Sequence, residues 1–355
     1  MPTIFERLLG VFSLDMGIDL GTANTAVCVG GQGIVLCEPS VVAVRKGTTE
    51  VLNDGQAVGA QAKSMLDKCP GNIEAIRPLR NGVISDFEIT EAMLSYFIRK
   101  VHDRAWGLKP RLIISVPMGI TGVEKRAVIE SAERAGARSV FLIEQPKAAA
   151  LGAGLPISDP AGSMIVDIGG GTTDVAVLSL QGVVNYETLR IAGDEATSAI
   201  KKYIKANCNL LVGEQTAERI KISIGSVVPM ELLGQDEMQM EIRGRNMTTN
   251  LPGKAVITSM QMREALAPVV REITGAIKRT LEKTPPEIAA DLVDQGIMLA
   301  GGGSQLRGLD YYLEHEVNLP VRCAEEPLYS VVRGTEAVLK ELDSYEDLLE
   351  SADDI

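Results

Sequence analysis

Two widely separated segments of this chain share one short pattern. The first reads IDLGTANTAV at residues 18–27, and the second reads VDIGGGTTDVAV at residues 166–177. In each segment an apolar run ends in Asp, a turn of small residues follows, and a second apolar run begins. This pattern predicts a β-hairpin with backbone N–H groups exposed at its tip. Because no bulky side chain covers such a tip, an anion can approach the backbone closely.

The duplication of this hairpin favours a nucleotide as the anion. Two tips that face each other can bind a polyphosphate from both sides, and we expect Asp19 and Asp167 behind them to hold Mg²⁺, mainly through water. One Gly-rich hairpin by itself is more often an ordinary turn. Two copies with Asp in the same position indicate a nucleotide-binding protein.

Length and composition predict two domains and argue against several classes of protein. A chain of 355 residues exceeds the usual size of a single hydrophobic core. A formal charge of −12 argues against nucleic acid as a partner, since such proteins carry a basic face. The five scattered cysteines indicate reduced thiols in a cytoplasmic protein, and two histidines are too few for a typical zinc site. No apolar run is long enough to span a bilayer.

A third Gly-rich segment supports the nucleotide interpretation. IMLAGGGSQL at residues 297–306 predicts a buried strand that runs into three glycines and then into a helix. Glycine lets the backbone lie against a base or ribose, and the helix N-terminus favours a phosphate. The rival patterns GxxxxGK[ST] and GxGxxG before a helix are absent from the sequence, which excludes a P-loop enzyme and a dinucleotide dehydrogenase.

Strand and helix patterns alternate along the chain and predict an α/β fold with mixed sheets. We expect extended segments at 13–20, 25–29, 34–45, 50–52, 111–117, 139–144 and 296–300. We expect helices at 56–67, 88–104, 124–135, 147–152, 193–206, 214–223, 259–282 and from about 304. Hairpin, strand and helix recur in each half, which predicts two similar lobes around a central nucleotide cleft. The acidic tail from Glu341 onward is expected to be a solvated, frayed end.

The N-terminal segment is a candidate for contact with lipid. Its apolar residues fall on one helical face: Ile4, Phe5, Leu8, Leu9 and Phe12. This face either dips into a membrane surface or packs against the body of the protein, and the sequence leaves both alternatives open. Trp106 and Leu108, in a predicted loop, form a second candidate. Two weak apolar contacts together suffice for reversible membrane binding, whereas either alone is marginal.

The order of these elements resembles the superfamily of actin, heat-shock chaperones and sugar kinases, and seven segments resemble the MreB family of bacterial actins more closely. They are GIDLGTANT (17–25), EPSVVA (38–43), AIRPLRNGVISDFE (75–88), AGLPI (153–157), VDIGGGTTDVAVLSL (166–180), AERIK (217–221) and GIMLAGGGSQLRGLD (296–310). These segments cover nearly the whole chain and stop at the acidic tail. The resemblance implies an actin-like fold with duplicated mixed-sheet cores.

The resemblance also implies a division into four subdomains. The core of lobe I (IA) would comprise 1–33, 75–145 and about 325–345, with 34–74 as the small subdomain IB. The core of lobe II (IIA) would comprise 146–182 and 247–324, with 183–246 as the small subdomain IIB, and 346–355 would be the acidic tail.

The resemblance implies that ATP or ADP binds together with Mg²⁺, and it assigns residues to this site. The first phosphate loop would be Gly21, Thr22, Ala23 and Asn24, and the second Gly169, Gly170, Gly171, Thr172 and Thr173. The adenosine would contact Glu218, Lys221, Gly301, Gly302 and Gly303. Asp19 and Asp167 would order the metal ion and its waters.

Members of the MreB family form ATP-dependent antiparallel double filaments on the inner face of the cell membrane. The resemblance therefore implies self-association, a lipid surface and membrane proteins of the wall-elongation machinery as partners. The helix that carries Val123, Glu124 and Arg126 matches the helix that pairs protofilaments in that family. By its residues alone it is an ordinary amphipathic helix.

One position departs from the family pattern. Relatives usually have Glu before the proline at 146, where it positions the attacking water, but this chain has Gln145. An amide orients water but cannot accept its proton, so we expect slow ATP hydrolysis with Gln145, Thr172 and Asp167 positioning the water. Actin itself has glutamine in the comparable place. Glu144 is the obvious substitute, but in an extended segment it points the opposite way.

Two other classes of function use the same fold. A small-molecule kinase would transfer the γ-phosphate to a substrate hydroxyl and would need an acceptor pocket with a carboxylate base. No segment of the sequence resembles a sugar site. A monomeric regulatory ATPase would bind ATP without polymerising at any concentration.

Overall fold

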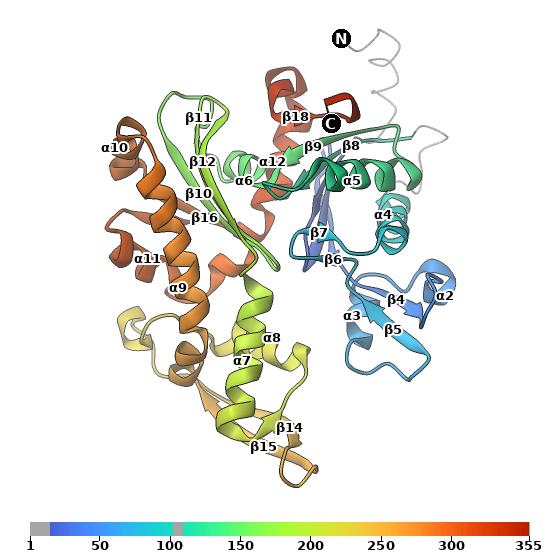
Figure 1. The fold of residues 1–355 in the computed structure, drawn as a ribbon, viewed down its shortest axis with the longest axis vertical. Helices are drawn as coiled ribbons and strands as arrows, with labels where there is room; N and C mark the ends of the chain where they lie inside the picture. Colours follow the sequence, from blue (N-terminus) through green and yellow to red (C-terminus); the bar gives the residue numbers. More distant parts are fainter. Residues whose placement is uncertain (1–14, 102–108, 355) are drawn as a thin grey trace. The chain divides into compact units, whose positions relative to one another are not determined.

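The computed structural model describes residues 15–101 and 109–354. It divides into two compact units, Met1–Asp159 with Leu328–Ile355, and Pro160–Pro327 (Figure 1). The predicted lipid-binding residues lie outside the described ranges: Ile4, Phe5, Leu8, Leu9, Phe12, Trp106 and Leu108. Within the described ranges, no helix has both the length and the apolar character needed to cross a bilayer.

The first unit is built on a six-stranded mixed sheet with the order β18-β9-β8-β1-β2-β3. These strands are β1 (Met16–Leu20), β2 (Asn24–Val29), β3 (Gly33–Pro39), β8 (Arg111–Val116), β9 (Ser139–Glu144) and β18 (Leu349–Glu350). β1, β8 and β9 run parallel, while β2 and β3 extend the sheet in antiparallel hairpins. The central strands are nearly continuous apolar runs because helices cover both faces.

The helices of this unit are α2 (Leu52–Gly55), α3 (Ala60–Met65), α4 (Phe87–Val101), α5 (Gly122–Arg134), α6 (Gln145–Gly152) and α12 (Ser330–Lys340). On one face of the sheet α4 contributes Ile89, Met93 and Phe97 to the apolar core. On the other face α12 lies so close to β1 that a Cβ on Gly17 would stand 2.2 Å from Thr335 Oγ1. Two short pairs, β4 (Val42–Arg45) with β5 (Ile73–Ile76) and β6 (Leu79–Arg80) with β7 (Val83–Ile84), complete the unit.

The second unit contains a five-stranded mixed sheet with the order β12-β11-β10-β16-β17 and a small sheet β13-β14-β15. The strands are β10 (Ser163–Ile168), β11 (Thr173–Ser179), β12 (Gly182–Leu189), β13 (Leu210–Leu211), β14 (Gln239–Asn246), β15 (Pro252–Thr258), β16 (Ile297–Ala300) and β17 (Val321–Cys323). The helices are α7 (Gly193–Cys208), α8 (Glu214–Ile224), α9 (Ser259–Lys283), α10 (Pro286–Gln295) and α11 (Leu309–Val317).

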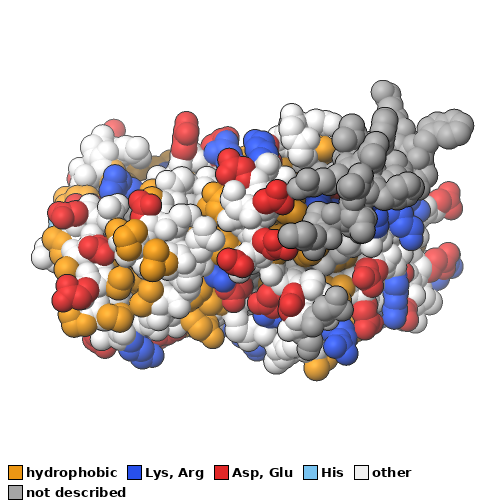
Figure 2. Space-filling model, turned by 90° about the horizontal axis from the view of Figure 1, so that it is seen from above, with side chains coloured by type: hydrophobic (Ala, Val, Ile, Leu, Met, Phe, Trp, Pro, Cys, Tyr) orange, Lys and Arg blue, Asp and Glu red, His pale blue; other side chains and the backbone are white. Residues whose placement is uncertain are grey.

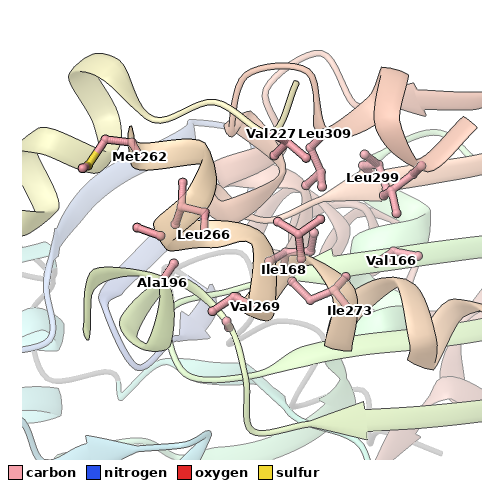
Figure 3. Close-up of a cluster of buried hydrophobic side chains, with 14 of the residues drawn as sticks. Val166, Ile168, Ala196, Val227, Met262, Leu266, Val269, Ile273, Leu299 and Leu309 are labelled. Atoms are coloured by element: carbon pink, nitrogen blue, oxygen red, sulfur yellow. The ribbon is translucent and has the colours of Figure 1, made fainter. Parts of the chain in front are cut away.

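Helix α9 supplies one side of the core of this unit (Figure 3). A capping box between Thr258 and Gln261 starts the helix. Its apolar stripe meets side chains from β10, β16 and α7, and the labelled members of this cluster are Val166, Ile168, Ala196, Val227, Met262, Leu266, Val269, Ile273, Leu299 and Leu309. The helical spacing of the stripe matches the pattern from which a helix over 259–282 was predicted.

The two larger sheets share one topology. In each sheet, three consecutive antiparallel strands form one side: β1-β2-β3 in the first unit and β10-β11-β12 in the second. Two further strands, parallel to the first of these three, lie on the other side: β8 and β9, or β16 and β17. β1 corresponds to β10 and β8 to β16, so Asp19 and Asp167 occupy equivalent positions. The predicted α/β class with duplicated mixed sheets is therefore confirmed.

By their contacts, residues 146–159 group with the first unit. The resemblance assigned them to the core of lobe II, and that division into subdomains stays a prediction. They group with the first unit because α6 packs closely against α12, where a Cβ on Gly334 would stand 1.8 Å from Ala148 O. Gly152 makes a similar approach to Ser330 O. Glycine on both helices lets their backbones meet, which fixes α6 to the first unit.

The expectation that the acidic tail is frayed was wrong in part. Its segment β18 pairs antiparallel with β9 at the edge of the first sheet. Leu348 is only 3% exposed, and Glu350 forms an ion pair with Lys125 of α5. Apolar residues within the acidic run dock this segment, which composition alone does not show.

Candidate functional site

The first hairpin tip is held in shape by side chains from outside the loop. Ser40 Oγ donates to Gly21 O over 2.6 Å, and Ser40 N donates to Ala23 O over 3.0 Å. Since the Ser40 hydroxyl proton is used there, Thr25 Oγ1 donates to Ser40 Oγ. Thr22 Oγ1 accepts from the N–H of Gly82. Ser40 was not singled out from the sequence, although it lies in the EPSVVA segment.

Close approach of the backbone makes glycine necessary in this tip. A Cβ on Gly21 would stand 2.5 Å from Asn24 O. The loop Gly21–Asn24 therefore forms the tight turn of small residues that the sequence predicted. Thr22 is nearly buried.

Asp19, one residue before the end of β1, lies directly behind this tip. Ser115 Oγ donates to its Oδ1 over 2.8 Å, and a contribution from the Gln145 side chain also acts to lower the pKa of its carboxyl. Desolvation outweighs both effects and raises the pKa of the Asp19 carboxyl from 3.8 to about 6. A carboxylate in such surroundings gains from a nearby cation, so the position fits the metal role predicted for it.

The second hairpin tip is held by the backbone of α7. The N–H of Gly193 donates to Gly169 O over 3.1 Å, and that of Asp194 donates to Gly170 O over 2.8 Å. Across the tip, Gly169 N donates to Thr172 O over 2.9 Å. The carbonyl groups of the loop are thus satisfied by the protein, and the loop is joined to a helix N-terminus.

Asp167, one residue before the end of β10, lies behind this second tip and is 6% exposed. The turn after β16 passes directly beside it: a Cβ on Gly301 would stand 2.3 Å from Ile168 O and 2.4 Å from Asp167 Oδ1. Gly301 also has a φ of +77°, a conformation that favours glycine. The structure therefore brings the three-glycine turn Gly301–Gly303 against the end of β10, beside the second hairpin tip. The helix expected from about 304 begins only at Leu309, after a short 3₁₀ turn.

The residues predicted to hold adenosine lie on α8 in the same unit. Lys221 Nζ donates to Gly193 O over 2.8 Å and to Thr197 Oγ1 over 3.0 Å, which ties its ammonium group to the start of α7. Glu218 lies one turn earlier on α8 and is partly exposed. Arg307 Nη1 donates to Ile222 O over 2.9 Å, which joins the end of α8 to the segment after the three glycines. Arg307 was not singled out from the sequence.

The predicted water-positioning residues fall in both units. Gln145, at the start of α6, is in the first unit and is 7% exposed, while Thr172 and Asp167 are in the second. Glu144 forms an ion pair with Lys147 over 2.9 Å, so its carboxylate is engaged by a residue other than Gln145.

The helix predicted to pair filaments is α5. Val123 is 79% exposed and Arg126 is also exposed. Glu124 has a local role, because it forms a capping box with Thr121 at the helix N-terminus. Val123 and Arg126 are thus available on the surface, whereas Glu124 fixes the start of the helix.

Among residues 15–101 and 109–354, no group of three or more His, Cys, Asp or Glu side chains is arranged to hold a metal ion. Mg²⁺ does not need such a cage. It is usually bound by one or two carboxylates together with waters and phosphate oxygens of a substrate. A single carboxylate such as that of Asp19 suits this kind of site.

A family model described as MreB/Mbl protein matches residues 13–347. The chain belongs to the MreB/Mbl family. It is 50% identical over 333 residues to the cell shape-determining protein Mbl of Bacillus cereus, covering 94% of this chain and 98% of that protein. It is 49% identical over 343 residues to the cell shape-determining protein MreB of Escherichia coli, covering 96% of this chain and 98% of that protein.

A solved structure of an MreB protein confirms the actin-like fold. MreB5 of Spiroplasma citri bound to AMPPNP superimposes with a TM-score of 0.87 at 35% identity, covering 94% of this chain and 98% of that chain. The same protein bound to ADP gives a TM-score of 0.88. The resemblance to MreB drawn from the sequence is therefore confirmed.

Proposed function

We propose that this chain is an ATP-binding cytoskeletal protein that polymerises into membrane-associated antiparallel double filaments and directs cell-wall elongation and cell shape. Its membership of the MreB/Mbl family supports this proposal, since its relatives are cell shape-determining proteins. The protein would be cytoplasmic and peripheral on the inner face of the cell membrane. Its partners would be further copies of itself, membrane lipid and membrane proteins of the wall-elongation machinery.

The observation that carries nucleotide binding is the duplicated hairpin, which places an aspartate, Asp19 or Asp167, near the end of each first strand behind a tight tip. The hairpin tips bind the phosphates of ATP or ADP through their backbone N–H groups. The MreB5 structures bound to AMPPNP and ADP support this assignment. Mg²⁺, when bound, neutralises charge on the phosphates. Glu218, Lys221 and Gly301–Gly303 hold the adenosine.

Hydrolysis is proposed to be slow and subordinate to assembly. Gln145 orients the attacking water through its amide, together with Thr172 and Asp167. Because an amide cannot accept the proton of that water, general-base assistance is missing at this position.

Exposed apolar surface supports self-association. Large apolar side chains of the second unit that are more than half exposed include Leu180, Ile222, Leu232, Leu251, Val256 and Val293. Figure 2 shows hydrophobic side chains gathered on part of the second unit's surface. Apolar side chains that gather on one face are typical of sites where proteins associate. Val123 and Arg126 on α5 provide the proposed lateral contact between protofilaments.

Membrane contact is proposed for the N-terminal residues Ile4, Phe5, Leu8, Leu9 and Phe12 together with Trp106 and Leu108. Deleting residues 1–10 and replacing Trp106 should weaken liposome binding more than either change alone. If neither change alters liposome binding, this assignment is rejected.

Sedimentation with liposomes and negative-stain imaging test the proposed function. Wild type, Asp167→Ala and the control Asp236→Ala, which alters an exposed aspartate of the same unit, are compared with ATP, ADP and no nucleotide. We expect paired filaments on lipid with ATP for wild type and the control but not for Asp167→Ala. Protein that binds ATP yet stays monomeric at high concentration would favour a regulatory ATPase, and ADP release that depends on an added substrate would favour a kinase.

A further inference from the structure

Three neighbouring strand ends of the first unit converge on one carboxylate. Asp19 on β1 lies directly opposite Ser115 on β8, and Gln145 follows the end of β9, the next strand. Paired residues of adjacent strands point to the same face of a sheet, so the Ser115 hydroxyl reaches Asp19 Oδ1 over 2.8 Å. Ser115 is 1% exposed and Gln145 is 7% exposed. Both donors are thus buried around Asp19.

The internal duplication shows that the fold does not require this hydroxyl. In the second unit the residue directly opposite Asp167, on the strand equivalent to β8, is Ala300. The same sheet topology is therefore built with a methyl group in the position of Ser115. The buried hydroxyl of Ser115 thus has no counterpart at the position opposite Asp167. Because it donates to Asp19, we infer that it has a specific role.

Hydrogen-bond capacity fixes the orientation of Gln145. An ionised carboxylate only accepts hydrogen bonds, so the contact from Gln145 to Asp19 uses the amide nitrogen. The carbonyl oxygen of the same amide then remains to accept a hydrogen bond from water. Asp19 and Gln145 therefore act as one unit, and Ser115 fixes that unit from the other side.

We propose that Ser115 is a positioning residue of the ATP site. It holds the Asp19 carboxylate in the orientation that binds the nucleotide's Mg²⁺, and through Asp19 it orients the amide of Gln145 toward the attacking water. This inference rests on the proposed nucleotide-binding function. Ser115 acts through Asp19 and contacts neither the nucleotide nor the metal ion itself. Groups that orient a metal-binding side chain typically change metal affinity by about 10- to 100-fold when they are removed.

The proposal predicts an effect on the metal rather than on the nucleotide. Without Ser115, Asp19 loses a donor and becomes free to rotate, so a higher Mg²⁺ concentration is needed for the same ATP binding. Nucleotide binding in excess EDTA, which does not use Asp19 through a metal ion, should be unchanged. A hydroxyl that only supported the fold would weaken both kinds of binding together.

The test measures binding of a fluorescent ATP analogue to the full-length protein, in EDTA and across a Mg²⁺ titration. The variants are Ser115→Ala and, as a matched control, Ser163→Ala, which removes a buried strand hydroxyl that has no hydrogen-bond partner among the described residues. For Ser115→Ala we expect the half-saturating Mg²⁺ concentration to rise about tenfold, with EDTA binding unchanged. Ser163→Ala should match wild type, and Ser115→Thr, which keeps the hydroxyl, should restore most of the Mg²⁺ response.

Gln145→Met provides a second variant, should Ser115→Ala fail to unfold cooperatively. It removes the other donor to Asp19 at similar volume and should shift the Mg²⁺ titration in the same direction. An unchanged Mg²⁺ titration in Ser115→Ala, or in Gln145→Met if only that variant folds, overturns the positioning role and leaves the ATP site intact. An equal loss of binding in EDTA and in Mg²⁺ also overturns it. A wild-type protein that binds no nucleotide in Mg²⁺ instead rejects the proposed function.

Discussion

The two hairpins of this protein share a backbone but surround their aspartates with different groups. Across the sheet Asp19 faces the hydroxyl of Ser115, whereas Asp167 faces the methyl group of Ala300. In the first unit the carboxylate is therefore oriented by side-chain donors. In the second unit the turn at Gly301 passes against the carboxylate. Duplication has preserved the topology, while the residue opposite each aspartate has diverged.

The tips differ in the same way. Ser40 fixes the first tip through its side chain, which donates to Gly21 O. The second tip is fixed by backbone N–H groups of Gly193 and Asp194 at the start of α7. Single substitutions of side chains should therefore disturb the first tip, and changes at glycine should disturb the second.

The largest effect is expected from Gly301→Ala in the second unit. The new methyl group would stand 2.3 Å from Ile168 O, and a φ of +77° is unfavourable for alanine. Strain and overpacking together should lower the free energy of unfolding by about 3 kcal/mol. Denaturant unfolding measures this loss. Gly71→Ala, where the methyl group would meet nothing within 4 Å, should change stability little, and equal losses in both variants would contradict the account.

A pH effect separates Asp19 from an ordinary surface carboxyl. Burial raises the pKa of Asp19 to about 6 from 3.8, so in the nucleotide- and metal-free protein the folded state keeps a proton that the unfolded state loses. The stability contributed by this group is present below about pH 4 and is lost as pH rises through about 6, a change of about 3 kcal/mol.

Asp19→Asn removes this dependence. The stability of the variant relative to wild type should therefore grow between about pH 4 and pH 7. Urea unfolding of both proteins across this range, in EDTA, tests the prediction. Parallel pH profiles would show that Asp19 is not desolvated.

A smaller loss is expected from Ser40→Ala in the first unit. The variant leaves Gly21 O without its 2.6 Å hydrogen bond and should lower the free energy of unfolding by about 1.5 kcal/mol. Ser64→Ala, which alters an exposed hydroxyl of α3, should cost less than about 0.5 kcal/mol. If the two variants unfold at the same denaturant concentration, side chains do not fix the first tip.

The smallest effect concerns β18, which has no counterpart in the second sheet. Lys125 and Glu350 form an ion pair in which both side chains are partly exposed, so Lys125→Ala should cost about 0.5 kcal/mol. A double-mutant cycle with Glu350→Ala isolates this interaction. A coupling energy several times larger would mean that charge, rather than the burial of Leu348, docks the tail.

Local signals in the sequence predicted the hairpins because their strands, turns and aspartates lie within about ten residues of one another. The periodic helix α9 was predicted nearly to its ends for the same reason. Ser115 and Ser40 were missed because each lies in an ordinary strand or loop segment, and only sheet pairing brings it to the hairpin. A hydroxyl in a buried strand carries no local sign of its partner.

The remaining differences arise from packing between distant segments. The placement of α6 in the first unit depends on its contact with α12, whose residues follow it by more than 170 positions. The tail was predicted to be frayed because acidic residues dominate its composition, although it also contains the apolar pair Leu348 and Leu349. Pairing of such a short strand with β9 is decided by the folded sheet edge rather than by the propensity of the strand.

Calorimetric titration of ATP in Mg²⁺ with wild type, Asp19→Ala and Asp167→Ala tests the central claim most directly, namely that the aspartates of both hairpins take part in nucleotide binding. The account predicts that each substitution alone weakens binding in Mg²⁺ at least about tenfold, with one nucleotide bound per chain in wild type. Wild-type affinity in either variant would contradict it, because the aspartate concerned would then have no part in the site.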